Sequence, residues 1–167
     1  AISVVDFSLL VLNSSQFNFN QAARKEDNNM TDTVKNPECT FLDKYPTDTR
    51  GSLHLSEHSQ ASVISCSFSN NIVETLGSAI DIQSHSKMDI MDTHFHNNRA
   101  GHVGGAIAAA VYCEVNITHC NFQSNMAARD GGAIFSSDAT ALKIEGSTFH
   151  SNMAGRDGGA LYIEHGI

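Results

Sequence analysis

The chain has 167 residues, of which 41% are hydrophobic and 7% aromatic, with no tryptophan and a formal net charge of −8. This length suffices for one domain with its own core, and the acidic balance argues against nucleic acid or an anionic membrane surface as a partner. No stretch reaches the roughly 20 apolar residues that a membrane-spanning helix needs, so we expect no membrane insertion by this segment.

The first 20 residues are predicted to form one coil of a repeat structure. Six of them precede residues of the same type in the next repeat by 51 positions: Ile2, Val4, Leu10, Leu12, Phe17 and Asn20. The segment 21–49 then interrupts the repeat with both prolines and many charges. We expect an inserted surface loop there, either a tolerated excursion or part of a binding face.

From residue 50 to residue 167 the chain follows a period of 27 residues. A glycine opens each unit, and a phenylalanine is followed three residues later by an asparagine. These positions are Gly77, Gly104, Gly131 and Gly158, Phe68, Phe95, Phe122 and Phe149, and Asn71, Asn98, Asn125 and Asn152. A fixed period of this length is the signature of a solenoid.

Each unit contains two short runs that alternate apolar and polar residues, as in Leu142-Lys143-Ile144-Glu145. Such runs are too short for helices and are split by small polar residues, so they are predicted strands. Apolar residues of the first run align between units at Leu53, Ile80, Ile107, Ile134 and Leu161. The sequence therefore predicts an all-β parallel β-helix, with one coil per repeat and a single domain over residues 1–167.

The recurring residues have structural roles in such a fold. The phenylalanines are predicted to stack along the interior, and the glycines to allow a tight turn. The asparagines fall where the chain must turn, so we expect left-handed backbone there and amides hydrogen-bonded from coil to coil.

Neither end of the sequence is typical of a cap. Residue 1 already lies inside a predicted strand, and the chain stops at GGALYIEHGI. Because an open β-helix exposes unpaired strand edges, we expect an uncapped fragment with further coils of a parent chain as partners, or ends covered by another element.

Four cysteines leave little scope for disulfides. Cys66 and Cys120 occupy one position two coils apart, about 9.6 Å, which exceeds the bridging limit of about 7 Å. Cys113 is too far from Cys120 along an extended strand, so only Cys39 in the loop is free to find a partner. We expect Cys66 and Cys120 to be buried thiols.

Sequons and histidines suggest further surface chemistry. Asn13, Asn29 and Asn116 begin Asn-x-Ser/Thr motifs and would be glycosylation acceptors in a secreted eukaryotic protein, although chance matches are expected in a chain this rich in Asn and Ser. His94 and His96 share one coil, and His150 lies two coils beyond His96. That spacing is too wide for a shared metal ion, so we expect solvated side chains.

A carbohydrate-active enzyme is an alternative, because parallel β-helices also carry polysaccharide lyases and hydrolases. Such chemistry needs clustered carboxylates. Five acids expected to face outward are scattered: Asp81, Asp89, Glu114, Glu145 and Glu164. Only Asp130 and Asp157 stack, and each follows an arginine, Arg129 or Arg156. We favour exposed ion pairs over a calcium or catalytic site and predict no catalytic residue, metal or cofactor.

Tandem GGAI and FxxN motifs resemble the repeats of the chlamydial polymorphic membrane protein family. They stand at 104–107 and 131–134 and at 122–125 and 149–152, and the likeness covers residues 51–167 well. The sequence departs from the GGAI pattern at residues 77–80, which read GSAI. The resemblance implies a right-handed β-helix from an autotransporter-type surface adhesin, with no catalytic residues to carry over.

The sequence and this resemblance together favour an extracellular or cell-surface scaffold that displays a binding face, most plausibly for adhesion. Its expected partner is a protein or glycan on a host or neighbouring cell. A carbohydrate-active β-helix and a structural spacer or self-assembling element remain open as alternatives.

Overall fold

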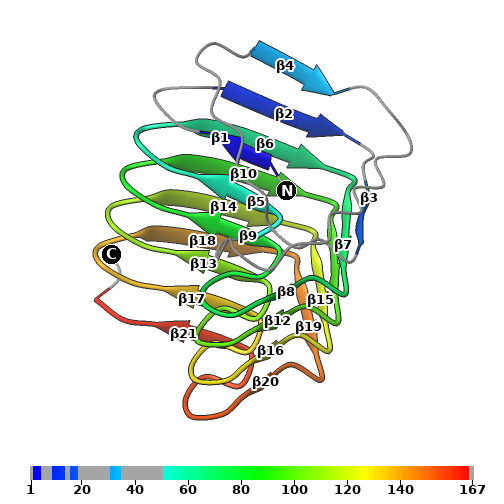
Figure 1. Cartoon of the computed structure of the whole chain (residues 1–167), viewed down its shortest axis with the longest axis vertical. Helices are drawn as coiled ribbons and strands as arrows, with labels where there is room; N and C mark the ends of the chain where they lie inside the picture. Colours follow the sequence, from blue (N-terminus) through cyan, green and yellow to red (C-terminus); the bar gives the residue numbers. More distant parts are fainter. Residues whose placement is uncertain (1, 5–8, 14–15, 19–30, 35–50, 166–167) are drawn as a thin grey trace.

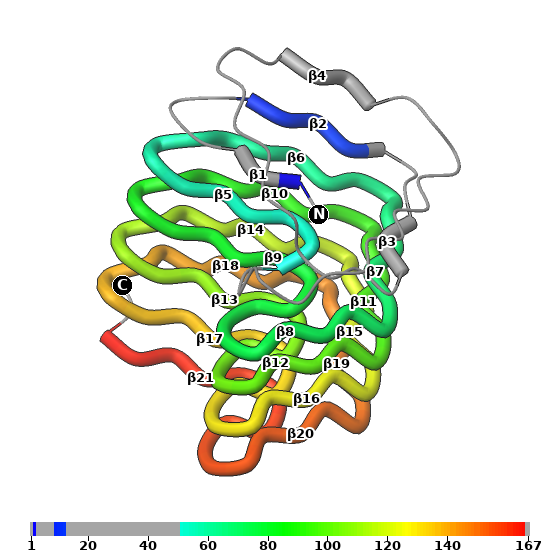
Figure 2. Tube along the Cα trace, viewed as in Figure 1, coloured from blue at the N-terminus to red at the C-terminus, as the bar shows by residue number. Residues whose placement is uncertain are grey.

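The computed structural model describes residues 2–4, 9–13, 16–18, 31–34 and 51–165, and in them the chain is an all-β solenoid of parallel strands (Figure 1). The fold prediction is confirmed. Successive turns of the chain stack along one axis, so that each coil lies on the one before it (Figure 2). Each regular coil contributes one strand to each of four sheets, named A to D here in chain order.

The strands of each sheet are neighbours in space but about one coil apart in sequence. Sheet A consists of β1 (Ile2–Val4), β5 (Leu53–Leu55), β9 (Ile80–Ile82), β13 (Ile107–Ala109), β17 (Ile134–Ser136) and β21 (Leu161–Ile163). Sheet B consists of β4 (Thr31–Val34), β2 (Leu9–Asn13), β6 (Gln60–Ile64), β10 (Lys87–Met91), β14 (Glu114–Thr118) and β18 (Ala141–Glu145).

The other two sheets are built from shorter strands. Sheet C consists of β3 (Gln16–Asn18), β7 (Ser67–Ser69), β11 (His94–His96), β15 (Asn121–Gln123) and β19 (Thr148–His150). Sheet D consists of β8 (Ile72–Val73), β12 (Arg99–Ala100), β16 (Met126–Ala127) and β20 (Met153–Ala154).

The strand register follows the sequence period. Within the regular coils every paired residue lies 27 positions from its partner, as in Ile107 with Ile134. The first coil pairs at the predicted offset of 51, as in Ile2 with Leu53. Part of the predicted loop 21–49 is a strand, because β4 pairs in parallel with β2. The rest of that segment, with Cys39 and Asn29, lies outside the described residues, as does Asn20.

Phenylalanines and aliphatic side chains fill the interior. Phe68, Phe95 and Phe122 are fully buried, and with Phe149 they form a continuous stack. Their ring centroids are 5.2, 4.7 and 4.8 Å apart, with rings nearly parallel. Strand alternation explains the arrangement, because every second side chain points inward and the 27-residue period puts like residues on top of one another.

The turns rely on left-handed backbone at fixed coil positions. Gly77, Gly104, Gly131 and Gly158 all have positive φ, between 48° and 66°. The repeated asparagines Asn71, Asn98, Asn125 and Asn152 form what we call the asparagine ladder. The prediction of left-handed backbone at these residues is wrong, because the left-handed residue is the one before each of them: Asn70, Asn97, Ser124 and Ser151. The ladder asparagines themselves contribute hydrogen bonds instead.

The second glycine of GGAI has a different role, which the sequence analysis does not assign. A Cβ on Gly132 would lie 2.0 Å from the carbonyl oxygen of Gly159 and 2.5 Å from the backbone of Met153. At Gly132 the approach of the next coil therefore leaves no room for a side chain.

Candidate functional site

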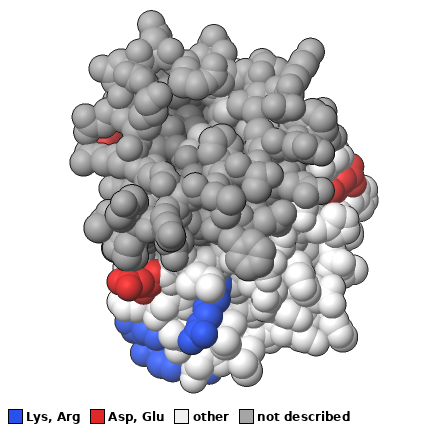
Figure 3. Space-filling model, turned by 45° about the vertical axis from the view of Figure 1, so that its right-hand side comes forward, with Lys and Arg blue, Asp and Glu red and all other residues white. Residues whose placement is uncertain are grey.

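The outer side of sheet C is covered by polar side chains other than Asp, Glu, Lys and Arg. We call it the polar face, and its members are Ser67, Ser69, His94, His96, Asn121, Gln123, Thr148 and His150. No Asp, Glu, Lys or Arg occupies an outward position of β7, β11, β15 or β19. In Figure 3, charged side chains on the described part of the surface are few and lie at the lower left, the upper left and the right edge.

The outer side of sheet B differs, because it carries charged pairs. Lys87 Nζ lies 2.8 Å from Glu114 Oε1, and Lys143 Nζ lies 3.0 Å from Glu145 Oε1. The Glu114 carboxylate raises the pKa of Lys87, and the Lys87 ammonium lowers that of Glu114. Exposed pairs of this kind add little stability. The polar face is therefore distinct from its neighbour, and its lack of charge does not follow from strand alternation.

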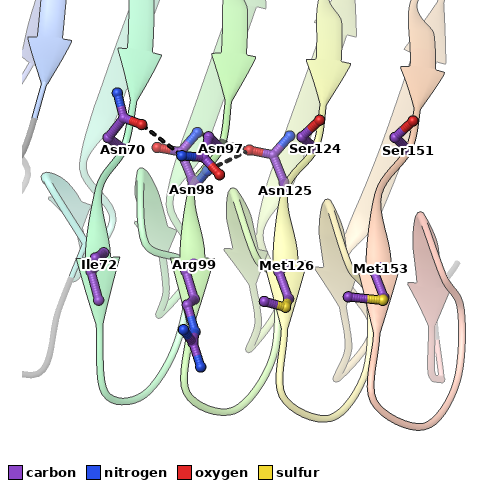
Figure 4. A pocket seen from close by; sticks show the side chains of 10 residues that line it. All are labelled: Asn70, Ile72, Asn97, Asn98, Arg99, Ser124, Asn125, Met126, Ser151 and Met153. Atoms are coloured by element: carbon purple, nitrogen blue, oxygen red, sulfur yellow. Dashed lines mark hydrogen bonds between the residues drawn. The ribbon is translucent and has the colours of Figure 1, made fainter.

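A groove of about 460 Å³ runs beside the polar face, where the chain bends from sheet C into sheet D. One row of its lining consists of the left-handed residues Asn70, Asn97, Ser124 and Ser151 (Figure 4). A second row consists of the outward residues of sheet D: Ile72, Arg99, Met126 and Met153. The groove thus has an amide and hydroxyl wall next to a mostly apolar one.

Exposure of the apolar row is high for side chains of this type. Ile72 is 59% exposed and Met153 57% exposed, although neither lies in a loop. The Arg99 side chain extends toward the following turn, away from the asparagines (Figure 4). Arg99 forms no ion pair with any described residue. A cation and two large apolar groups therefore face solvent together.

The asparagine ladder supports this groove from beneath. Asn71 Nδ2 donates to Asn98 Oδ1 at 2.8 Å, and Asn125 Nδ2 donates to Asn152 Oδ1 at 3.0 Å. Asn98 Nδ2 also donates to the carbonyl oxygen of Phe68 at 3.0 Å. Each ladder amide therefore joins two coils, and the groove rests on fixed backbone.

The stacked acids do not form the expected exposed ladder. Asp130 is buried, with its side chain 5% exposed, and the Arg156 guanidinium of the next coil holds it through bonds of 3.2 and 2.9 Å. This contact raises the pKa of Arg156. Asp157 is exposed, and its backbone N–H donates to Asp130. The prediction of exposed pairs is wrong for Asp130, because Arg156 pairs across coils rather than with its sequence neighbour.

The prediction of an exposed position is also wrong for Asp81. It was expected to face solvent, but it is 3% exposed and accepts a hydrogen bond from His54 Nδ1 at 2.9 Å. Gln83 donates to its other oxygen. All residues of β5 and β9 are buried, so outward-pointing residues of these strands do not reach solvent. Asp89, Glu114, Glu145 and Glu164 are exposed as expected.

The three histidines are exposed and Cys66 and Cys120 are buried, as the spacing predicts. His94, His96 and His150 are exposed, and among the described residues no three His, Cys, Asp or Glu side chains come together in a possible metal site. Cys66, Cys113 and Cys120 are buried thiols, and burial raises the pKa of the last two.

The glycosylation motifs are only partly visible. Asn116 lies on β14 and its Nδ2 donates to Asp89 at 2.8 Å. The backbone of Asn13 ends β2, and its side chain lies outside the described part of the structure, as does all of Asn29.

The parallel coils, their interior stacks and the amide ladder together define a β-helix, and a family model described as the right handed beta helix region matches residues 2–166. The chain belongs to this family. The match covers the irregular N-terminal part as well as the 27-residue coils of this right-handed β-helix. Searches of curated proteins and of solved structures found no match. Within the described ranges, no helix is long and apolar enough to cross a bilayer.

Proposed function

We propose that this right-handed β-helix is a non-catalytic scaffold of an extracellular or cell-surface protein, and that it displays the polar face as a binding surface for adhesion. The partner is a protein or glycan on a host or neighbouring cell. The GGAI and FxxN motifs support a place among repeats like those of the chlamydial polymorphic membrane proteins.

The polar face is the single observation that carries this proposal. Eight outward side chains on four strands offer hydrogen-bond donors and acceptors without a formal charge of the Asp, Glu, Lys or Arg type. A partner that binds the polar face does not have to strip water from an Asp, Glu, Lys or Arg side chain, and this desolvation is a large cost of association at charged surfaces. The parallel strands hold these side chains on rigid backbone, so little order is lost on binding.

Two acids that an enzyme could have used have structural contacts instead. Asp130 is held by Arg156, and Asp81 by His54 and Gln83. These contacts favour the scaffold over the carbohydrate-active alternative.

The test compares two double substitutions of the purified protein in binding to cells and to glycan and protein arrays. His96→Glu with Gln123→Glu places two charges on paired strands of the polar face. Met91→Glu with Thr118→Glu places the same charges in register on sheet B. We expect binding to be lost only in the polar-face variant, with no reducing ends released from any bound polysaccharide.

Equal losses in the two variants would locate binding elsewhere and contradict the proposal. Release of reducing ends by the wild type, abolished in Asp130→Asn, would replace the scaffold with an enzyme.

A further inference from the structure

The turns that join sheet A to sheet B carry a row of rings on their outer side. His58, His85 and Tyr112 occupy one position in three successive coils, and all three are exposed. Their ring centroids are 4.9 and 5.2 Å apart, with interplanar angles of 22° and 17°. These turns lie at the left of Figure 1, as between β13 and β14. The rings therefore form an outer stack that sheet B separates from the polar face.

This outer stack stops after Tyr112. The next coil has Ala139 at the same position, so a methyl group stands where the earlier coils have a ring. Among the described residues, only His85 stacks on Tyr112. The Tyr112 side chain is 62% exposed, more than any other large hydrophobic side chain of the described chain. The place over Ala139 can therefore take one more flat group against the free face of Tyr112.

Acidic side chains border this open place. Asp138 directly precedes Ala139, and its carbonyl oxygen accepts a hydrogen bond from the Tyr112 N–H at 2.9 Å. Ser137 Oγ donates to the Asp138 carboxylate at 3.0 Å, and Glu164 begins the same turn in the next coil. Both acids are exposed, and neither forms an ion pair with a described residue. The open place therefore favours a positively charged group.

The backbone of the turn does not account for the tyrosine. Each regular coil has two consecutive left-handed residues here, and Val111 and Tyr112 have φ of 66° and 58°. Glycine, asparagine and aspartate suit this conformation, whereas a β-branched valine and a bulky tyrosine do not. Strained residues of this kind are concentrated at binding sites. The pair is thus better explained by a ligand than by the turn.

A guanidinium group fits the open place better than an ammonium group does. It is planar, so it can lie parallel to the phenol ring of Tyr112 within the cation–π distance of about 6 Å. A group stacked there lies at the level of the next coil, about 4.8 Å away, where it meets Asp138. The edge of the guanidinium can donate two parallel hydrogen bonds to one carboxylate, whereas an ammonium is a more strongly hydrated point charge.

We propose that the free face of Tyr112 and the carboxylate of Asp138 form a binding site for an arginine side chain of a partner protein. Glu164 adds negative charge at the same turn. This inference goes beyond the proposed function, because the site lies on another side of the solenoid and does not involve the polar face.

Amide chemical shift titration of the whole 15N-labelled protein tests the site with three blocked tripeptides: Gly-Arg-Gly, Gly-Lys-Gly and Gly-citrulline-Gly. The amides of Asp138 and Ala139 should shift with the arginine peptide, and the lysine peptide should bind about threefold more weakly. Citrulline has the shape of arginine without its charge and should cause no shift. Free arginine should also bind more weakly than the peptide, because the two acids repel its carboxylate.

Three substitutions locate the binding. Tyr112→Ala removes the ring, and Asp138→Asn removes the charge but keeps a residue suited to left-handed backbone. Each should weaken binding of the arginine peptide about fivefold. Ala139→His fills the open place and should abolish binding, and it is compatible with the turn because His85 holds the same position two coils earlier. Asp157→Asn, an exposed acid of another turn, should change nothing.

Four results would each overturn the inference. They are the absence of any shift with the arginine peptide, equal binding of the citrulline or lysine peptide, an affinity for free arginine as high as for the arginine peptide, and unchanged binding in Ala139→His. The polar-face variant, His96→Glu with Gln123→Glu, should bind the arginine peptide as the wild type does. Loss of cell binding in that variant and loss of arginine binding in Ala139→His therefore test the two proposals independently.

Discussion

Asn98 and Asn125 share two hydrogen bonds across adjacent coils: the Asn125 Oδ1 accepts from the Asn98 side-chain amide at 2.9 Å and from the Asn98 backbone N–H at 3.1 Å. Both side chains are buried, so no water can replace these partners. The ladder therefore couples the bend that forms the groove to the interior of the solenoid.

Asn98→Ala should lower the free energy of unfolding by about 3 kcal/mol, because it leaves several buried polar groups without partners. Asn97→Ala, one residue earlier and exposed, should cost only about 1 kcal/mol, because alanine is less favourable than asparagine in the left-handed backbone at this position. Urea unfolding followed by circular dichroism measures both. Similar losses in the two variants would show that the ladder contributes no more than an ordinary surface amide.

Phe122→Ala should lower the free energy of unfolding by about 4 kcal/mol, since it opens a cavity between Phe95 and Phe149 in the interior stack. Phe135→Ala provides the control, because Phe135 lies on the outer side of sheet A opposite Ala108. Its loss should stay below about 1 kcal/mol. Phe122→Leu separates the two contributions, because it keeps most of the buried volume and removes only the ring contacts. A loss as large as that of Phe122→Ala in the same unfolding curves would show that ring contacts, rather than the cavity, dominate.

Arg156→Gln should lower the unfolding midpoint more than Arg129→Gln does, because only Arg156 neutralises the buried carboxylate of Asp130. Asp157→Asn should have little effect, since Asp157 is exposed. Differential scanning calorimetry of the three variants ranks them directly. If Asp157→Asn lowered the midpoint as much as Arg156→Gln, the stabilising partner of Arg156 would be Asp157 and not Asp130.

The buried thiols should not react with iodoacetamide in the folded protein at pH 8. Burial raises the pKa of Cys113 and Cys120 and shields all three described thiols from the reagent. A Cys39→Ser background removes the fourth cysteine from the measurement. Mass spectrometry should find three modifications after unfolding in urea and none before, and any labelling of the folded chain would contradict their burial.

Cys113 and Cys120 should make stability fall at alkaline pH. Their pKa is raised in the folded chain, so their contribution is complete below the unfolded value and is lost as pH rises through the folded one. Loss should therefore begin near pH 9, the ordinary value for these groups. Cys113→Ser with Cys120→Ser should flatten this part of the profile, and both substitutions match Ser86 and Ser147 at the same coil positions. An unchanged profile would assign the alkaline loss to other groups.

Spacing alone predicted the coil, its register and the interior columns, because these depend on the 27-residue period. Phe122 over Phe95 and Asn125 over Asn98 follow from counting. The groove could not be predicted in this way, because it depends on the bend at Asn70, Asn97, Ser124 and Ser151.

The burial of Asp81 and Asp130 does not follow from the sequence pattern. Alternation correctly places Asp81 on the outer side of sheet A, but it does not say whether that side reaches solvent. Arg156 is adjacent to Asp157 in sequence and binds Asp130 instead, which only the distance between coils reveals.

The uniform step between coils makes the length of this protein adjustable. Removing residues 104–130 would join Val103 to Gly131 and keep the interior isoleucine, phenylalanine and asparagine columns in register, since Gly131 occupies the place of Gly104. Loss or gain of a whole unit thus shortens or extends both the polar face and the groove by one step without altering their chemistry. A lineage carrying this repeat could change the span of its ligand simply by changing copy number.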